Sequence, residues 1–285
     1  MFEPFAPQEP IQITAAGLTV TLDADSLLYR IDTLSRVWQQ NPEYAPRILL
    51  TDGSALLFSQ AGSIRHCHYD SGVGTGILSS YDGFCLAGKP LSFSFETLVW
   101  IEYATGYVRF ELIPGTDEYE FAQLRWPAPF VFGRPHRSAV TVMPVMQGLL
   151  IPNTWENEVR SLPFDGQFCS AAAYMPWFGQ IDGGPGYLAV CEQPWDAGYF
   201  IDHPAGGPST HVGLYCLPSL GHLSYRRIVR FQFFTSCDYN DLCKAYRGYA
   251  KETGLFTTLA EKSARSPLID RLIGSAIVHK GIKTH

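Results

Sequence analysis

The chain has 285 residues, of which 46% are hydrophobic, 14% aromatic and 17% charged. This composition supports a large folded core and excludes an intrinsically disordered chain. The formal net charge is −6 and no run of Lys and Arg residues occurs, so we expect neither nucleic acid nor a membrane as a partner. No apolar run approaches the roughly 20 residues of a membrane-spanning helix.

Cysteine, glycine and proline usage bears on compartment and fold class. The seven cysteines include no Cys-x-x-Cys spacing, which favours free thiols in a reducing cytoplasm over a disulfide framework. Residues 1–5 lack the basic and apolar regions of a secretory leader, so we expect a cytoplasmic protein. The 26 glycines and 20 prolines favour short strands and sharp turns over helices.

Alternating apolar and polar residues predict strands through most of the chain. Residues 108–112 form one such strand, and residues 114–117 predict a turn that joins it to 119–122 as a hairpin. Residues 182–186 predict another turn between two apolar runs. No helical periodicity longer than two turns occurs before Asp238, so we predict a mainly β protein built as a large antiparallel sandwich.

The pattern changes near the end of the chain. Residues 225–234 alternate as a half-buried strand with arginines on its polar face. Residues 239–252 then carry an apolar stripe with helical spacing. Asp238 is placed to cap this helix and Gly254 to end it.

A further short helix and a new apolar run follow. Ser266 and Gly274 delimit the helix, and Ile277 and Val278 belong to the run. The whole pattern indicates a multidomain protein of which this chain is one part. We predict a sandwich domain, a short C-terminal helical linker packed on it, and the first strand of another domain, at residues 1–237, 238–274 and 275–285 respectively.

Five segments of the chain together resemble one enzyme family. They are IDTLSRVW (31–38), LRWPAPF (124–130), MPVMQGLLIP (143–152), YMPWFG (174–179) and YRGYAKETG (246–254). The chain resembles the N-terminal domain of bacterial glycoside hydrolases akin to the α-N-acetylgalactosaminidase and endo-α-N-acetylgalactosaminidase group. The resemblance implies a β-supersandwich of galactose-mutarotase-like fold that precedes a catalytic TIM barrel. The first barrel strand would begin at Ile277 and Val278, and the catalytic carboxylates would lie in the barrel, which this chain lacks.

Glycoside hydrolysis usually needs two carboxyl groups that flank the scissile bond. Three sets of acids lie close together in the sequence: Asp117, Glu118 and Glu120; Glu156 and Glu158; Asp238 and Asp241. The first set lies on the predicted turn and the last caps the predicted helix, while the second follows Trp155 in a loop. Solvated or capping roles account for these acids, and we expect no catalytic residue in this chain.

The sequence predicts neither a metal site nor a cofactor. His66, Cys67 and His68 are the densest set of metal-type ligands, but alternation along a strand places Cys67 on the opposite face from the two histidines. The glycines of residues 72–76 lack the Lys-Ser/Thr ending of a phosphate-binding loop, and no helical pattern follows them.

Aromatic residues beside turns are the remaining functional signal, because flat rings stack on the C–H faces of sugars. The candidate carbohydrate-binding residues are Trp126, Trp155, Trp177, Trp195 and Glu192. We therefore predict a non-catalytic domain that braces a catalytic barrel and contributes to carbohydrate binding. Its expected partners are a carbohydrate and that barrel.

Two alternatives remain open. A stand-alone aldose epimerase would also use a β-supersandwich, with a histidine acid and a glutamate base at the anomeric centre. Its candidate residues are Glu192, His136, His203 and His211, although the Asn-His-containing stretch typical of aldose epimerases is absent. An autonomous carbohydrate-binding module would use the tryptophans alone.

Overall fold

The computed structural model of the chain describes residues 2–5, 10–118, 120–133, 139–146, 148–155, 165–170, 173–204, 209–218 and 221–275. The chain divides into two compact units, Met1–Leu242 and Cys243–His285. All described strands belong to the first unit, and the boundary falls inside helix α1 (Tyr239–Glu252).

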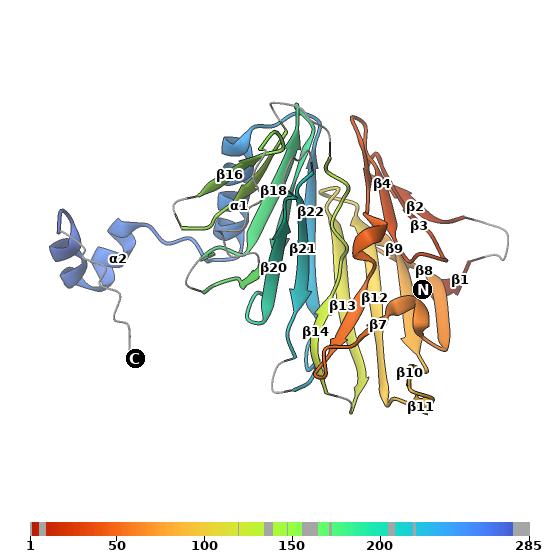
Figure 1. Cartoon of the computed structure of the whole chain (residues 1–285). Coiled ribbons are helices and arrows are strands. Elements are labelled where there is room, and N and C mark those ends of the chain that lie inside the picture. The colour runs from red at the N-terminus through yellow and green to blue at the C-terminus, as the bar shows by residue number, and fades with distance from the viewer. Residues whose placement is uncertain are drawn as a thin grey trace. The chain divides into compact units, whose positions relative to one another are not determined.

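The largest sheet of the first unit has ten antiparallel strands (Figure 1). In their spatial order they are β1 (Phe2–Pro4), β8 (Ser63–Ser71), β9 (Gly74–Asp82), β12 (Phe93–Glu102), β13 (Val108–Asp117), β22 (Arg227–Phe234), β19 (Gly186–Cys191), β18 (Trp177–Asp182), β15 (Ala139–Met143) and β16 (Leu149–Pro152). Strands from both halves of the unit therefore share one sheet.

Two smaller sheets, also antiparallel, complete the first unit. The six-stranded sheet contains, in spatial order, β17 (Asp165–Gln167), β20 (Ala197–Asp202), β21 (His211–Cys216), β14 (Phe121–Arg125), β6 (Arg47–Leu50) and β7 (Ala55–Leu57). The four-stranded sheet contains β2 (Ile11–Ala15), β3 (Leu18–Leu22), β4 (Tyr29–Asp32) and β5 (Val37–Gln39). A short hairpin and two 3-10 turns lie between these strands: β10 (Cys85–Leu86), β11 (Lys89–Pro90), η1 (Pro42–Tyr44) and η2 (Phe58–Gln60).

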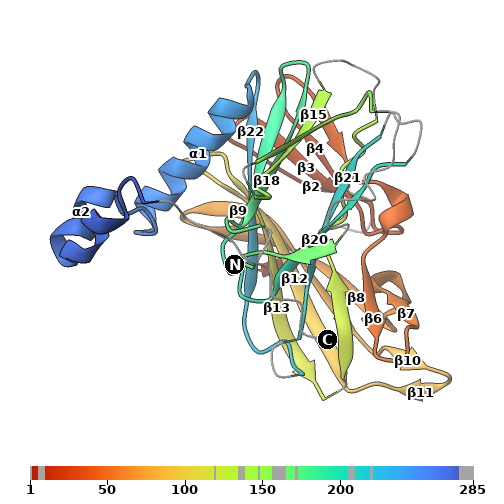
Figure 2. The same ribbon diagram turned by 60° about the vertical axis from the view of Figure 1, so that its left-hand side comes forward.

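The ten-stranded, six-stranded and four-stranded sheets all contribute buried residues to one hydrophobic core. Figure 2 shows β20 and β21 of the smaller sheet facing β18 and β22 of the larger one. Because side chains alternate between the two faces of a strand, every second residue points inward. Val99, Phe110 and Phe231 of the larger sheet are buried in one hydrophobic cluster with Leu124 and Leu214 of the smaller one. This arrangement confirms the predicted antiparallel β-sandwich.

The strand and helix predicted near the end of the chain are confirmed as β22 and α1. The backbone N–H of Asp241 donates to Asp238 Oδ1 at 3.0 Å, and the backbone N–H of Asp238 donates to Asp241 Oδ2 at 3.1 Å. These reciprocal bonds satisfy two amide groups at the start of α1. Gly254 follows the helix with a φ of +74°, a conformation that favours glycine.

Two short helices follow α1 in the second unit. Helix α2 (Leu259–Arg265), which the sequence reasoning missed, begins with a capping box between Thr258 and Glu261. The 3-10 helix η3 (Pro267–Leu272) occupies the predicted position of the further short helix. None of the described helices has the length and apolar character needed to cross a membrane.

The hairpin predicted around residues 114–117 is wrong. Strand β13 continues through these residues, and its register against β12 shifts between Phe93 and Phe95, which marks a β-bulge. Glycine fits at position 115 because a Cβ there would lie 2.6 Å from the carbonyl oxygen of Ser94. The next strand, β14, then pairs with β6 and β21 in the other sheet. The turn-forming residues therefore bend a long strand and do not reverse the chain.

Candidate functional site

A row of polar side chains crosses the ten-stranded sheet on the face that points away from the core. Trp100 of β12 lies opposite Arg109 of β13, which lies opposite Arg230 of β22. The residues on either side of this row, such as Phe110 and Phe231, face the core. Like charges directly opposite each other destabilise a strand pair, so the two arginines require a nearby carboxylate.

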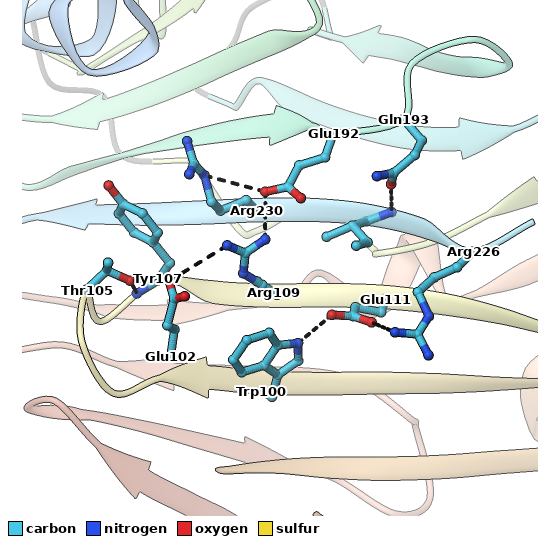
Figure 3. A network of polar contacts seen from close by, with 11 residues as sticks. Trp100, Glu102, Thr105, Tyr107, Arg109, Glu111, Glu192, Gln193, Arg226 and Arg230 are labelled. Carbon is cyan, nitrogen blue, oxygen red and sulfur yellow. Dashed lines mark hydrogen bonds and ion pairs between the residues drawn. The ribbon is translucent and has the colours of Figure 1, made fainter. Parts of the chain in front are cut away.

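Glu192, which follows β19, supplies that carboxylate (Figure 3). Its Oε1 accepts a hydrogen bond from Arg109 Nη1 at 2.7 Å and lies 3.8 Å from Arg230 Nε. Glu102 Oε2 lies 3.7 Å from Arg109 Nη2 and accepts a hydrogen bond from Thr105 Oγ1 at 2.5 Å. Two carboxylates thus balance two guanidinium groups drawn from four segments of the chain.

Aromatic rings extend this group of charges. The guanidinium of Arg109 lies 5.4 Å from the ring centroid of Trp100, within the range of a cation–π interaction. The Trp100 indole N–H donates to Glu111 Oε1 at 2.6 Å, and Glu111 Oε2 lies 3.1 Å from Arg226 Nη1. The guanidinium of Arg230 lies 4.5 Å from the ring of Tyr107. We call these eight residues the Arg109 network: Trp100, Glu102, Tyr107, Arg109, Glu111, Glu192, Arg226 and Arg230.

The contacts of Glu192 within the Arg109 network do not form a proton-transfer pair. Burial raises the pKa of the Glu192 carboxyl, against the opposing effect of Arg109 and Arg230. A raised pKa is one property of a general acid. However, the closest partner of Glu192 is a guanidinium, which stays protonated in proteins and cannot exchange a proton with it. The paired charges of the Arg109 network therefore satisfy one another across the strands of the sheet.

The charge pairs of Arg109 should stabilise the protein more than a solvent-exposed charge pair does. We expect Arg109→Met to lower the free energy of unfolding by about 1.5–3 kcal/mol, because hydrogen bonds to charged groups in half-buried positions contribute this much. The Arg109 side chain is 18% exposed, whereas that of Arg30, which pairs with the partly exposed Asp32, is 51% exposed. Arg30→Met is the matched control and should have a much smaller effect. Urea denaturation of both variants tests this, and equal losses would contradict it.

Two of the four candidate tryptophans are core residues. Trp126 is 6% exposed and Trp177 is 3% exposed. The ring of Trp126 packs on Phe110 with centroids 5.4 Å apart. A sugar ring has no access to either indole in this conformation. The surface position expected for these two residues from neighbouring prolines is therefore corrected to core packing.

The other two candidate tryptophans are exposed but lie far apart. Trp195 is 77% exposed and precedes the start of β20, whereas Trp155 is 39% exposed. The backbone carbonyl of Trp155 lies 3.0 Å from Nε2 of His203, just beyond the other end of β20. The six residues of β20 span about 20 Å. A single sugar ring cannot contact both tryptophans.

Of the residues considered for an epimerase, the three that the structure describes do not converge. Glu192 lies on the outer side of the ten-stranded sheet, in the Arg109 network. The ring of His211 packs on that of Tyr44 on the outer side of the six-stranded sheet, with centroids 5.1 Å apart. His203 is buried at the end of β20. Five residues named in the sequence reasoning lie outside the described residues: His136, Glu156, Glu158, Ile277 and Val278.

The histidines of β8 have partners within the sheet. His66 Nδ1 lies 2.8 Å from Ser79 Oγ, and His68 Nε2 lies 2.9 Å from Thr75 Oγ1. Burial lowers the pKa of His66. Among the residues that the structure describes, no three His, Cys, Asp or Glu side chains are grouped so that they could hold a metal ion.

Sequence reasoning missed the Arg109 network as a group. Its members come from strands that are distant in the sequence, and only the register of β12, β13 and β22 brings them into one row. The available signal was the recurrence of charged residues at alternate positions of strongly apolar strands, as at Arg109 and Glu111 or at Arg226 and Arg230. This alternation identifies the polar face of each strand but not which strands lie beside it.

Comparison with known proteins gives one strong similarity. No family model and no curated protein matches the chain. Among solved structures, α-N-acetylgalactosaminidase NagBb from Bifidobacterium bifidum in complex with Gal-NHAc-DNJ is similar, with a TM-score of 0.87 and 40% identity. That match covers 96% of this chain and 44% of NagBb. The NagBb complex with GalNAc gives a TM-score of 0.84 and 40% identity, covering 90% of this chain and 41% of NagBb.

The chain is similar to part of a glycosidase. The match covers less than half the length of NagBb but 90–96% of this chain. A ligand-free NagBb structure gives a TM-score of 0.82 at 38% identity over 90% of this chain, so the similarity does not depend on the bound sugar.

Proposed function

We propose that this chain is a non-catalytic N-terminal domain of a glycosidase, in which it braces a catalytic barrel. The observation that supports this most strongly is the similarity to NagBb at 40% identity over 90% of the chain but only 41% of NagBb. The sandwich would then be a β-supersandwich of galactose-mutarotase-like type. The carboxylate pair that hydrolysis requires would come from the remaining part of the enzyme.

The proposed substrate class is a glycan with α-linked N-acetylgalactosamine, as the name of NagBb indicates for that enzyme. Within this proposal, Trp195 is the best-placed aromatic residue for a sugar contact because its ring is the most exposed of the six tryptophans in the chain. Trp155 would serve a separate contact, since it lies beyond the opposite end of β20. Glu192 would contribute to carbohydrate binding as a member of the Arg109 network.

The Arg109 network is the proposed contact surface for the catalytic part. Interfaces between domains of one chain are more polar than protein cores, and paired charges suit such an interface. The network holds three carboxylates and three guanidinium groups at distances of 2.7–3.8 Å. Further burial of an already paired charge costs less than burial of a free one, because each charge keeps its partner.

An assay of the chain by itself tests the non-catalytic role. We expect no release of aryl alcohol from aryl α-N-acetylgalactosaminides and no acceleration of galactose mutarotation measured by polarimetry. The Glu192→Gln variant is the control for any signal. Turnover of the aryl glycoside that disappears in Glu192→Gln would place catalysis in this chain, and mutarotation that disappears in it would support the epimerase instead.

A further inference from the structure

A cavity of about 140 Å³ opens on the outer side of the six-stranded sheet. Its walls include Glu43, Tyr44, Arg47, Arg125 and Phe200. The volume is close to the ~150 Å³ of an engineered protein cavity that holds one benzene molecule. A single six-membered ring therefore fits.

Two arginines form one side of this cavity and lie directly opposite each other. Arg125 of β14 is the register partner of Arg47 of β6. Both point away from the core, because their neighbours Leu124 and Ile48 belong to the hydrophobic cluster. Like charges in this position repel each other. Burial and the positive charge of Arg47 both lower the pKa of Arg125.

Neither arginine forms an ion pair with a carboxylate among the described residues, although the charge of Asp165 acts on Arg125 from a longer distance and raises its pKa against the effects of burial and Arg47. Arg47 Nε donates to the backbone carbonyl of Ala45 at 3.0 Å, and its Nη2 donates to that of Glu43 at 3.0 Å. Arg125 Nε donates to Gln123 Oε1 at 2.7 Å. In the described part of the chain, no Asp or Glu oxygen lies within the 4.0 Å of an ion pair from either guanidinium. Among the described residues, no hydrogen bond engages the terminal nitrogens of Arg125.

Aromatic rings form the other side of the cavity and are fixed in place. The ring of Phe200 lies 5.1 Å from the guanidinium of Arg125 and stacks on Tyr44 with centroids 5.7 Å apart. Phe200 lies across Gly213, where a Cβ would come within 2.0 Å of the ring. The Tyr44 hydroxyl donates a hydrogen bond to the Asp202 carboxylate, so this carboxylate already has a partner. The cavity thus combines aromatic rings with two guanidinium groups, and hydrogen bonds to the protein already orient each guanidinium.

We propose that this cavity binds an acidic sugar, whose oxyanion lies between Arg47 and Arg125 and whose ring lies against Tyr44 and Phe200. Two guanidinium groups match the planar, two-oxygen geometry of a carboxylate. The apolar ring walls suit the C–H face of a sugar. Among the described residues that line the cavity, Glu43 is the one acid, and its charge should oppose the ligand.

Titration of the chain with glucuronate, followed by NMR or calorimetry, tests the proposal. We expect saturable binding in the millimolar range and binding of neutral glucose at least about tenfold weaker. Added salt should weaken the glucuronate affinity because the contact is ionic. Inorganic phosphate should compete with glucuronate. Absence of saturable binding, equal affinity for glucose, or failure of phosphate to compete would each overturn the proposal.

Four variants assign the binding to this cavity. Arg47→Gln and Arg125→Gln should each weaken glucuronate binding about tenfold, whereas Glu43→Gln should strengthen it. Arg65→Gln, at an exposed position on β8, is the matched control and should change nothing. Removal of one of two opposed like charges should also leave the urea midpoint of Arg47→Gln unchanged or higher. Unchanged binding in folded Arg125→Gln would overturn the proposal. Because the titration uses this chain alone, its outcome is independent of whether the chain braces a barrel.

Discussion

Replacement of Asp196 by leucine will lower the free energy of unfolding by about 3–5 kcal/mol, because it leaves a buried guanidinium without its counter-charge. Arg227 and Asp196 are both buried, and Arg227 Nε donates to Asp196 Oδ1 at 3.1 Å. The remaining bonds of Arg227, such as the one from Nη1 to the Tyr225 carbonyl at 2.9 Å, do not replace a negative charge. Urea denaturation at neutral pH measures the loss.

The double variant Asp196→Leu/Arg227→Met is the control for this prediction. Removal of both charges replaces a buried ion pair by apolar side chains, which is often neutral or stabilising. The double variant should therefore regain most of the stability that Asp196→Leu loses. If it is as unstable as Asp196→Leu, the loss does not come from the unpaired charge of Arg227.

Replacement of Trp38 by alanine will have an effect of similar size for a different reason. Trp38 is buried in β5, and its ring lies 5.0 Å from that of Tyr187 and 6.1 Å from that of Phe130. The Arg36 guanidinium lies 4.3 Å from the ring on another side. Truncation of a buried tryptophan removes these contacts and leaves a cavity, which typically costs about 3–5 kcal/mol.

Trp195→Ala is the matched control, because it makes the same chemical change at an exposed side chain. It should alter the free energy of unfolding by no more than about 0.5 kcal/mol. Chemical denaturation followed by far-UV circular dichroism compares the two variants without relying on tryptophan fluorescence. Similar losses in both would mean that the ring of Trp38 does not anchor the core.

Elements with local signals were predictable from the sequence. Helix α1 was placed at its observed bounds because its apolar spacing, its Asp238 cap and Gly254 all lie within one short stretch. The turn at residues 182–186 likewise joins β18 and β19, and the backbone N–H of Asp182 donates to the Pro185 carbonyl at 2.8 Å. In both cases the residues that determine the structure are close neighbours in the chain.

Features that depend on distant pairing were not predictable. The residues at 114–117 carry turn chemistry, but the pairing of β13 with β12 overrides it and converts the turn into a bulge. The capping box of Thr258 and Glu261 was a local signal that the sequence reasoning did not use. Prediction therefore failed once for lack of long-range information and once through an overlooked motif.

The same distinction applies to the candidate sites. Residue type and positions beside turns suggested four tryptophans, yet exposure depends on which strands surround each ring, and Trp126 and Trp177 are buried. The partners that give Glu192 its environment, Arg109 and Arg230, lie on different strands. The strand register that places Arg47 opposite Arg125 likewise cannot be predicted from a single sequence. Chemistry-bearing residues can be named from a sequence, but their grouping follows from strand order.

Exchange of the matching segment of NagBb for this chain tests the central proposal most directly. We expect the chimera to hydrolyse an aryl α-N-acetylgalactosaminide with a kcat/KM within about tenfold of that of NagBb. The remaining part of NagBb, expressed without either segment, should be inactive or insoluble, because under our proposal the catalytic part loses the domain that braces it. A soluble remainder as active as intact NagBb, or a folded chimera with no activity, would contradict the account.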